Sequence, residues 1–213
     1  MWELSNDAIN IIVLSLDEIE TDQIVRFYAC KTLENICAQS TSAGHRFANI
    51  ETVKQLLKIY LMKLDEAKID DESYIQWYDG IRISAAIALS HICKLNPQLF
   101  PDIFETITPT KFCETLLDGS NQSRVQQAFI TMLNLALHNI YYPHISAILL
   151  KEKLFLKALL KLLEHQQIVI RGKCILTFLL LFKLDFRWMT VVQQEIKFFN
   201  ELDKLLKDNY KYV

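Results

Sequence analysis

Apolar residues recur at helical spacing along most of this chain, and one helical segment occurs more than once. The segment IVRFYACKTLENIC, residues 24–37, matches IRISAAIALSHIC, residues 81–93, at a constant shift of 56 positions. The shared positions step by three and four residues, so they lie on one face of a helix. The matched pairs are Arg26 and Arg82, Ala29 and Ala85, Leu33 and Leu89, Ile36 and Ile92, and Cys37 and Cys93. This pattern predicts that the chain uses one kind of helix repeatedly.

Two weaker copies of the same helix follow. Ala128 takes the place of Ala29 within residues 123–137, and Cys174 takes it within residues 170–182. The further matches are Met132 and Phe178 with Leu33, Leu135 and Leu181 with Ile36, and Arg171 with Arg26. The successive intervals of 56, 43 and 46 residues bracket the roughly 40–47 residues of HEAT and armadillo repeats. We therefore expect an all-α fold, an α-solenoid of about four HEAT/armadillo-type repeats.

Companion helices with their own start signals lie between the copies. Ser5, Asn49 and Thr108 each precede an apolar-periodic segment, which is typical of a helix N-cap. Two later companions are expected as single helices over residues 145–165 and 188–206. The acidic segment LDEAKIDDES, residues 64–73, has no apolar period and is expected to be a loop insertion.

Composition agrees with a helical array. Only 4 Gly and 4 Pro occur, and 51% of the 213 residues are hydrophobic, so the chain has ample core material and few turn signals. No linker rich in Gly, Ser or Pro divides the chain, and we expect residues 1–213 to form a single helical-repeat domain. Neither end has the polar outer face of a terminal repeat, so we expect a fragment of a longer chain.

Charge is nearly balanced overall but divides along the chain. Up to Tyr142 there are 11 Lys and Arg against 18 Asp and Glu; from Pro143 onward there are 12 against 7. A pI near 6.2 argues against nucleic acid as the partner. The longest apolar run, residues 174–182, is about half of what a bilayer requires, so no membrane insertion is expected.

No motif for catalysis or metal binding is present. The 5 cysteines form no C-x-x-C pair, which favours a reducing compartment such as the cytoplasm. Nucleotide-binding and kinase signatures and the H-E-x-x-H zinc motif do not occur, and the acidic segment lacks the glycine and ligand spacing of a calcium loop. The sequence predicts no catalytic residue, no cofactor and no metal, and so no enzyme within these residues.

Basic side chains are the candidates for partner binding. Lys153, Lys157 and Lys161 recur every four residues beside leucines. This spacing is typical of a basic amphipathic helix whose lysines form the solvent-exposed face. Arg26, Arg82 and Arg171 share one register, and two interpretations remain open: a structural tie to backbone carbonyls, or a ladder that lines a groove. The candidate contact residues are Lys54, Lys58, Arg82, Lys153, Lys157 and Lys161.

Two stretches resemble a known family. VRFYACKTLENIC, residues 25–37, and VIRGKCILTFLLLFK, residues 169–183, are similar to the C-terminal helical-repeat region of the RUNKEL/Fused-like branch of Unc-51-like kinases and pseudokinases. The resemblance implies that a kinase or pseudokinase domain belongs to the parent protein. It also implies a scaffold role in microtubule-linked processes such as cilium assembly or cytokinesis, while no kinase-site residue matches here.

The sequence thus predicts a non-catalytic scaffold that binds protein partners, cytoskeletal or ciliary ones among them, in the cytoplasm or at the cytoskeleton or cilium. One alternative is an armadillo-type transport or coat adaptor, which requires a ladder of Trp and Asn on the inner helices. A second alternative is a helical-repeat enzyme, which requires a buried acid beside His91 or His138.

Overall fold

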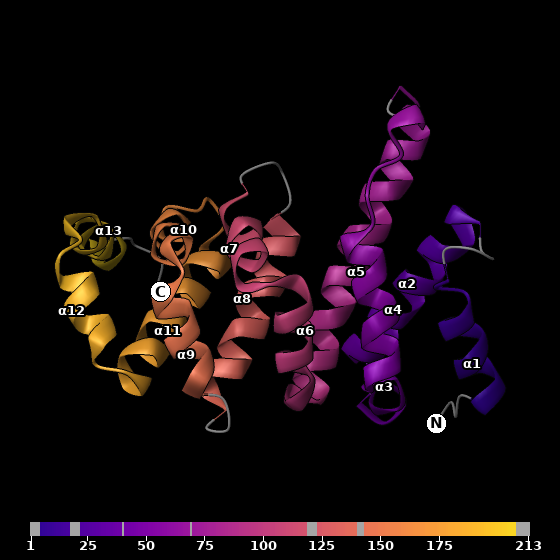
Figure 1. The fold of residues 1–213 in the computed structure, drawn as a ribbon, viewed down its shortest axis with the longest axis horizontal. Helices are drawn as coiled ribbons and strands as arrows, with labels where there is room; N and C mark the ends of the chain where they lie inside the picture. The colour runs from indigo at the N-terminus through magenta and orange to yellow at the C-terminus, as the bar shows by residue number, and fades with distance from the viewer. Residues whose placement is uncertain are drawn as a thin grey trace. The chain divides into compact units, whose positions relative to one another are not determined.

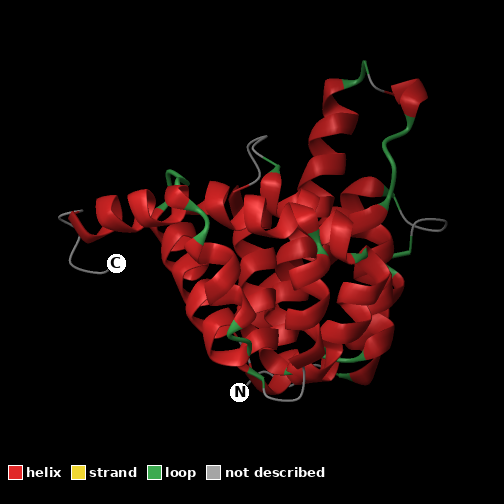
Figure 2. Cartoon of the chain, turned by 60° about the vertical axis from the view of Figure 1, so that its left-hand side comes forward, coloured by secondary structure: helices red, strands yellow, loops and turns green. Residues whose placement is uncertain are grey.

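The computed structural model describes residues 5–17, 22–39, 41–68, 70–118, 123–139 and 143–207. Across these ranges the chain forms thirteen α-helices and two short 3₁₀-helices, and no strand occurs in them (Figure 2). The prediction of an all-α chain is confirmed to this extent. Packing groups the residues into two compact units, Met1–Ile107 and Thr108–Val213, which are described one at a time. The single domain expected from the sequence stays a prediction.

The first unit contains two copies of the repeated helix and their companions (Figure 1). Its elements are α1 (Asn6–Leu14), α2 (Gln23–Gln39), α3 (Thr41–Phe47), α4 (Ile50–Leu61), η1 (Glu66–Lys68), α5 (Glu72–Leu95), η2 (Pro97–Leu99) and α6 (Phe100–Ile107). The first copy is α2, and the second forms the C-terminal half of α5. These two helices pack along each other, and α4 packs on α5 as well. The sequence did not predict α3 and α6.

Contacts between α2 and α5 show how one copy lies on the next. The rings of Phe27 and Trp77 meet edge to face, with centroids 5.2 Å apart. Gly80 lies so close to Phe27 that a Cβ at this glycine would be 3.1 Å from the Phe27 ring. About two turns further along α2 and about three turns further along α5, the charge of Glu34 acts on His91. Because the contacts advance in the same direction along both helices, α2 and α5 run parallel.

The predicted helix starts are confirmed. The Ser5 side chain accepts a hydrogen bond from the Ala8 amide at 3.1 Å, and the Asn49 side chain accepts one from Thr52 at 3.0 Å. Thr108 accepts from the Lys111 amide at 3.4 Å, and proline occupies the first helical position after it. Each cap satisfies an amide that the first turn of a helix leaves without a partner.

The acidic insertion is only partly a loop. Residues Glu66–Lys68 form a 3₁₀-turn, and α5 begins at Glu72, inside the expected loop. The Asp71 carboxylate accepts hydrogen bonds from the amides of Ser73 and Tyr74 at 3.0 and 3.1 Å, which starts the helix earlier than the apolar pattern indicated. The first turns of α5 project beyond α2 and α4 (Figure 1).

The second unit repeats this arrangement with the third and fourth copies. Its helices are α7 (Pro109–Leu117), α8 (Ser123–His138), α9 (Pro143–Lys151), α10 (Lys153–Leu163), α11 (Ile168–Leu184), α12 (Arg187–Gln193) and α13 (Ile196–Lys207). The third copy, α8, packs along the fourth, α11, while α10 packs on α7. Buried Asn134 on α8 joins the pair, since it donates to the Lys173 carbonyl at 2.9 Å and accepts from the Thr177 hydroxyl at 2.7 Å.

Two predicted helices are each divided in two. The expected helix 145–165 ends at Lys151, because the Glu152 side chain accepts from the Leu154 amide at 3.4 Å and caps a new helix, α10. The expected helix 188–206 is divided after Gln193. This break allows α12 to bury Trp188 and α13 to bury Phe198 against Phe178, at 4.8 Å between ring centroids.

A glycine pair tests this packing. Gly44→Ala would place a Cβ 2.7 Å from Leu95 Cδ1 and 3.2 Å from Cys37 Cα, whereas a Cβ at Gly172 would have no neighbour within 4 Å. We expect Gly44→Ala to lower the free energy of unfolding by about 1–2 kcal/mol. Gly172→Ala serves as the control and should raise it by up to about 1 kcal/mol, because alanine favours the helix. Urea unfolding followed by circular dichroism measures both, and equal effects would contradict the packing.

Candidate partner-binding surfaces

Arg82 joins the second copy of the repeated helix to the helix before it. Its Nε donates to the Tyr60 carbonyl at 3.0 Å, in the last turn of α4. Its guanidinium also lies over the rings of Tyr60 and Tyr78, at 5.4 and 5.3 Å from their centroids. The last carbonyls of a helix have no partner within it, so Arg82 satisfies one of them and stabilises the joint.

Arg171 does the same in the fourth copy. Its Nη1 donates to the carbonyls of His165 and Gln166, at 2.9 and 3.2 Å, just beyond the end of α10. Of the two interpretations open for the arginines, these bonds favour the structural tie at Arg82 and Arg171. Arg26, the first of the series, is buried beside a cavity of about 140 Å³ that Asp17 and Lys58 also line.

Gln126 supplies the equivalent donor in the third copy, which the sequence did not reveal. Its Nε2 donates to the carbonyls of Leu116 and Asp118, at 2.9 and 2.6 Å, at the end of α7. Gln126 therefore holds the position that Arg82 and Arg171 hold in their copies. This places the third copy one residue later than the sequence alignment, with Phe129 rather than Ala128 in the Ala29 position.

The lysines of α10 form an exposed basic row above buried leucines. Lys153, Lys157 and Lys161 are all exposed, while Phe155 and Leu159 on the opposite face are fully buried. Lys161 is engaged, because its Nζ donates to the Leu117 carbonyl at 2.7 Å. Within the described part of the chain, Lys153 and Lys157 make no ion pair or hydrogen bond. They are the part of this row that is available to a partner.

The other candidate lysines lie on α4, in the first unit. Lys54 and Lys58 are both exposed, one turn apart, and Val53, Leu56 and Leu57 of the same helix are buried. The structure does not test whether any of the six candidates contacts a partner. It does place Arg82 and Lys161 in bonds to backbone carbonyls, and it leaves the remaining four at the surface.

Two acidic side chains of the insertion, Asp65 and Asp71, interact with neighbouring residues of the insertion and of the first turn of α5. Asp71 caps α5, and Lys68 lies 3.8 Å from the Asp65 carboxylate and 5.1 Å from the centre of the Tyr74 ring. The described residues contain no group of three or more His, Cys, Asp or Glu side chains able to hold a metal ion. Nor do those ranges include a helix with both the length and the apolar character that a bilayer span requires.

The buried cysteines and the half-buried His91 have shifted pKa values. Burial raises the pKa of Cys30, Cys37, Cys93 and Cys113 to about 12, and it raises that of Cys174 as well. All five thiols are free and buried, so they are protonated at neutral pH and pack as small apolar groups. Burial lowers the pKa of His91, and the Glu34 carboxylate partly opposes this shift.

The features required by the two alternatives can be compared with this geometry. The adaptor alternative requires exposed Trp side chains that can contact a peptide. Trp188 is only 2% exposed and its Nε1 donates to Ser146 Oγ at 2.8 Å, so this side chain is part of the core. For an enzyme, Glu34 is buried near His91, but its carboxylate pairs with Lys31 at 2.7 Å. The 140 Å³ cavity is small beside the roughly 300–1,000 Å³ of ligand pockets. Neither alternative gains support.

Comparison with known proteins places the chain beside a plant kinase by sequence. The chain is 27% identical over 216 residues to the serine/threonine-protein kinase RUNKEL of Arabidopsis thaliana. The match covers the whole of this chain and only 15% of the length of that protein. The matching region is helical here and carries no kinase motif. This establishes distant homology to a non-kinase part of RUNKEL. No family model and no solved structure matches the chain.

The role of Gln126 can be tested with an adjacent control. Gln126→Leu keeps the size of the side chain but removes both hydrogen bonds to the end of α7. We expect it to lower the free energy of unfolding by about 1–3 kcal/mol, since the carbonyls lose their donor. Gln127→Leu, at a half-buried neighbouring position, should change it by less than about 0.5 kcal/mol. Similar losses in both variants, measured by urea unfolding, would remove Gln126 from this role.

Burial of the five thiols predicts that they react slowly with thiol reagents and that the free energy of unfolding depends on pH. At pH 8 no cysteine of the folded chain should react quickly with a disulfide reagent, whereas all five react once guanidinium unfolds it. Unfolded thiols ionise near their ordinary pKa of 9.0, but the folded ones keep their protons to about 12. Their contribution to stability is therefore complete below about pH 9 and falls as the pH rises from there. Rapid labelling of any thiol in the folded chain would contradict its burial.

Proposed function

We propose that this chain is a HEAT/armadillo-type helical-repeat module that binds protein partners and belongs to a RUNKEL-like serine/threonine kinase or pseudokinase. The observation that carries the proposal is the side-by-side packing of successive copies, α2 with α5 and α8 with α11. The carbonyl-binding side chains support it, because Arg82 and Arg171 recur at one position and Gln126 makes the equivalent bonds in the third copy. Homology along the whole chain points to the kinase parent.

A module of this kind acts as a scaffold and not as a catalyst. Stacked repeats offer extended surfaces, and specificity then comes from the exposed side chains on them. The exposed lysines Lys153 and Lys157 suit an acidic protein surface better than an apolar one. We propose a microtubule- or cilium-linked role in the cytoplasm or at the cytoskeleton, with protein and not nucleic acid as the partner.

Co-sedimentation with purified microtubules tests this proposal. We expect the chain to bind, and the double variant Lys153→Glu/Lys157→Glu to bind about tenfold more weakly at low salt, because two attractive charges become repulsive. The double variant Lys63→Glu/Lys94→Glu changes the charge equally at other exposed positions and should bind as the unmodified chain does.

The outcomes separate the parts of the proposal. If Lys54→Glu/Lys58→Glu weakens microtubule binding and the α10 double variant does not, the binding surface lies on α4. Equal losses in all three double variants would mean that only net charge matters. A chain that never pellets with microtubules would overturn the microtubule role.

A further inference from the structure

The repeated helix has two distinct packing faces. In the first unit, Phe27 of α2 packs against Trp77 and Gly80 of α5, and the charge of Glu34 acts on His91 further along the pair. The forward face is defined by the positions of Phe27, Lys31 and Glu34. The rear face is defined by the positions of Ile24, Tyr28, Thr32 and Asn35. The same faces are identified in the other copies from the aligned positions. Gly80 and His91 are then the Ile24 and Asn35 positions of α5.

The second unit uses the same two faces. Asn134 of α8 lies at the Glu34 position of the forward face once Gln126 is placed at the Arg26 position. Thr177 and Lys173 of α11, which it contacts, lie at the Thr32 and Tyr28 positions of the rear face. Forward-on-rear packing is therefore how adjacent copies meet in both units.

The forward face of α11 is open. It consists of Gly172, Leu176 and Leu179, and the two leucines are 45% and 59% exposed. A Cβ at Gly172 would meet nothing within 4 Å, so the surface has a gap there. On α2 and α8 the same face lies against the next copy and buries Glu34 and Asn134.

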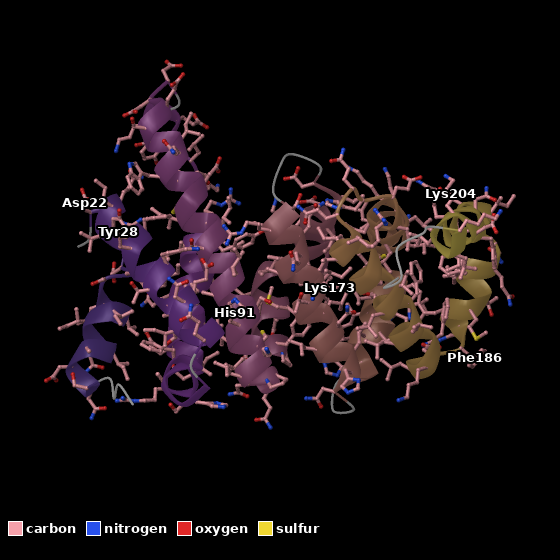
Figure 3. All side chains as sticks on the ribbon, turned by 180° about the vertical axis from the view of Figure 1, so that it is seen from behind. Asp22, Tyr28, His91, Lys173, Phe186 and Lys204 are labelled. Atoms are coloured by element: carbon pink, nitrogen blue, oxygen red, sulfur yellow. The ribbon has the colours of Figure 1, made fainter. Side chains whose placement is uncertain are left out.

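The rear face of α2 is open as well. Ile24 and Tyr28 are 46% and 59% exposed, and Thr32 and Asn35 beside them are exposed too. No charged residue lies among these four positions. Figure 3 labels Tyr28 on α2 and His91, the Asn35 equivalent, on the neighbouring helix α5.

The two open faces are complementary in size. In the α2 and α5 pair, the forward position carries the large ring of Phe27 and the rear position carries Gly80. In the open faces the large and the small residue change places. The forward position that holds Phe27 in α2 holds Gly172 in α11, and the rear position that holds Gly80 in α5 holds Ile24 in α2. A large side chain opposite a glycine fills the space in either order.

We propose that two copies of this chain associate head to tail, with the forward face of α11 in one molecule packed on the rear face of α2 in the other. Charge favours this pairing, since residues up to Tyr142 carry a net charge of −7 and those from Pro143 onward carry +5. The two faces differ, so a dimer keeps one free forward face and one free rear face through which further copies can add.

Sedimentation velocity on the purified chain tests the self-association, independently of any microtubule binding. The average mass should rise steadily between about 1 μM and about 1 mM without stopping at a dimer. Added salt should weaken the association, since opposite net charges attract less when screened. A mass that stays monomeric throughout overturns the proposal and assigns the faces to a different occupant, such as a helix of another protein.

Two variants remove one face each. Leu179→Asp places a charge on the forward face of α11, and Ile24→Asp places one on the rear face of α2, in a first turn where an acidic residue suits the helix. Each should weaken self-association about tenfold to hundredfold. An equimolar mixture of the two should form one-to-one dimers with unmodified affinity, because each variant keeps the face that the other lacks.

Controls make the mixing result decisive. Leu206→Asp introduces the same change on α13, at a leucine that is 78% exposed, and should associate like the unmodified chain. Far-ultraviolet circular dichroism establishes that each variant is folded. A mixture that remains monomeric would overturn the head-to-tail arrangement. An Ile24→Asp variant that still dimerises alone would overturn it too, because the contact would then join two forward faces.

Discussion

Packing of one copy of the repeated helix along the next is the interaction on which each unit depends. A single amphipathic helix cannot bury its apolar face alone, so α2 requires α5 and α8 requires α11. The contacts are specific and not merely apolar. Phe27 fits against Gly80, and Asn134 bonds to both Thr177 and the Lys173 carbonyl. A polar group buried in such an interface stabilises the correct register, because any slip leaves it without partners.

The ends of the companion helices impose a second constraint. Each helix leaves its last carbonyls without intrahelical partners, and burial of these ends next to another helix makes a donor necessary. Arg82, Gln126 and Arg171 supply it from the same position of three copies. This explains why the arginine register recurs in the sequence and also why a glutamine replaces it once, since an amide nitrogen can make the same bonds.

These constraints assign most of the conspicuous polar residues to structure and leave few for a partner. Trp188, Glu34 and the five cysteines belong to the core, and Lys161 belongs to the joint between α10 and α7. Lys153 and Lys157 remain as an exposed basic pair on α10, and Lys54 and Lys58 as another on α4. Homology to a non-kinase part of RUNKEL agrees with a chain whose recognisable chemistry is packing and surface charge.

The sequence by itself determined the helical class, the caps at Ser5, Asn49 and Thr108, and the repeated helix, because periodicity and capping are local properties. Only the tertiary structure decided the breaks at Glu152 and after Gln193 and the true register of the third copy. Each of these involves a contact between different helices: the Glu152 carboxylate accepts from the Thr110 hydroxyl at 2.8 Å, Phe198 packs on Phe178, and Gln126 donates to the Leu116 carbonyl. It also decided which lysines are engaged, since Lys153 and Lys161 have the same local pattern and differ only in that the Leu117 carbonyl lies within reach of Lys161.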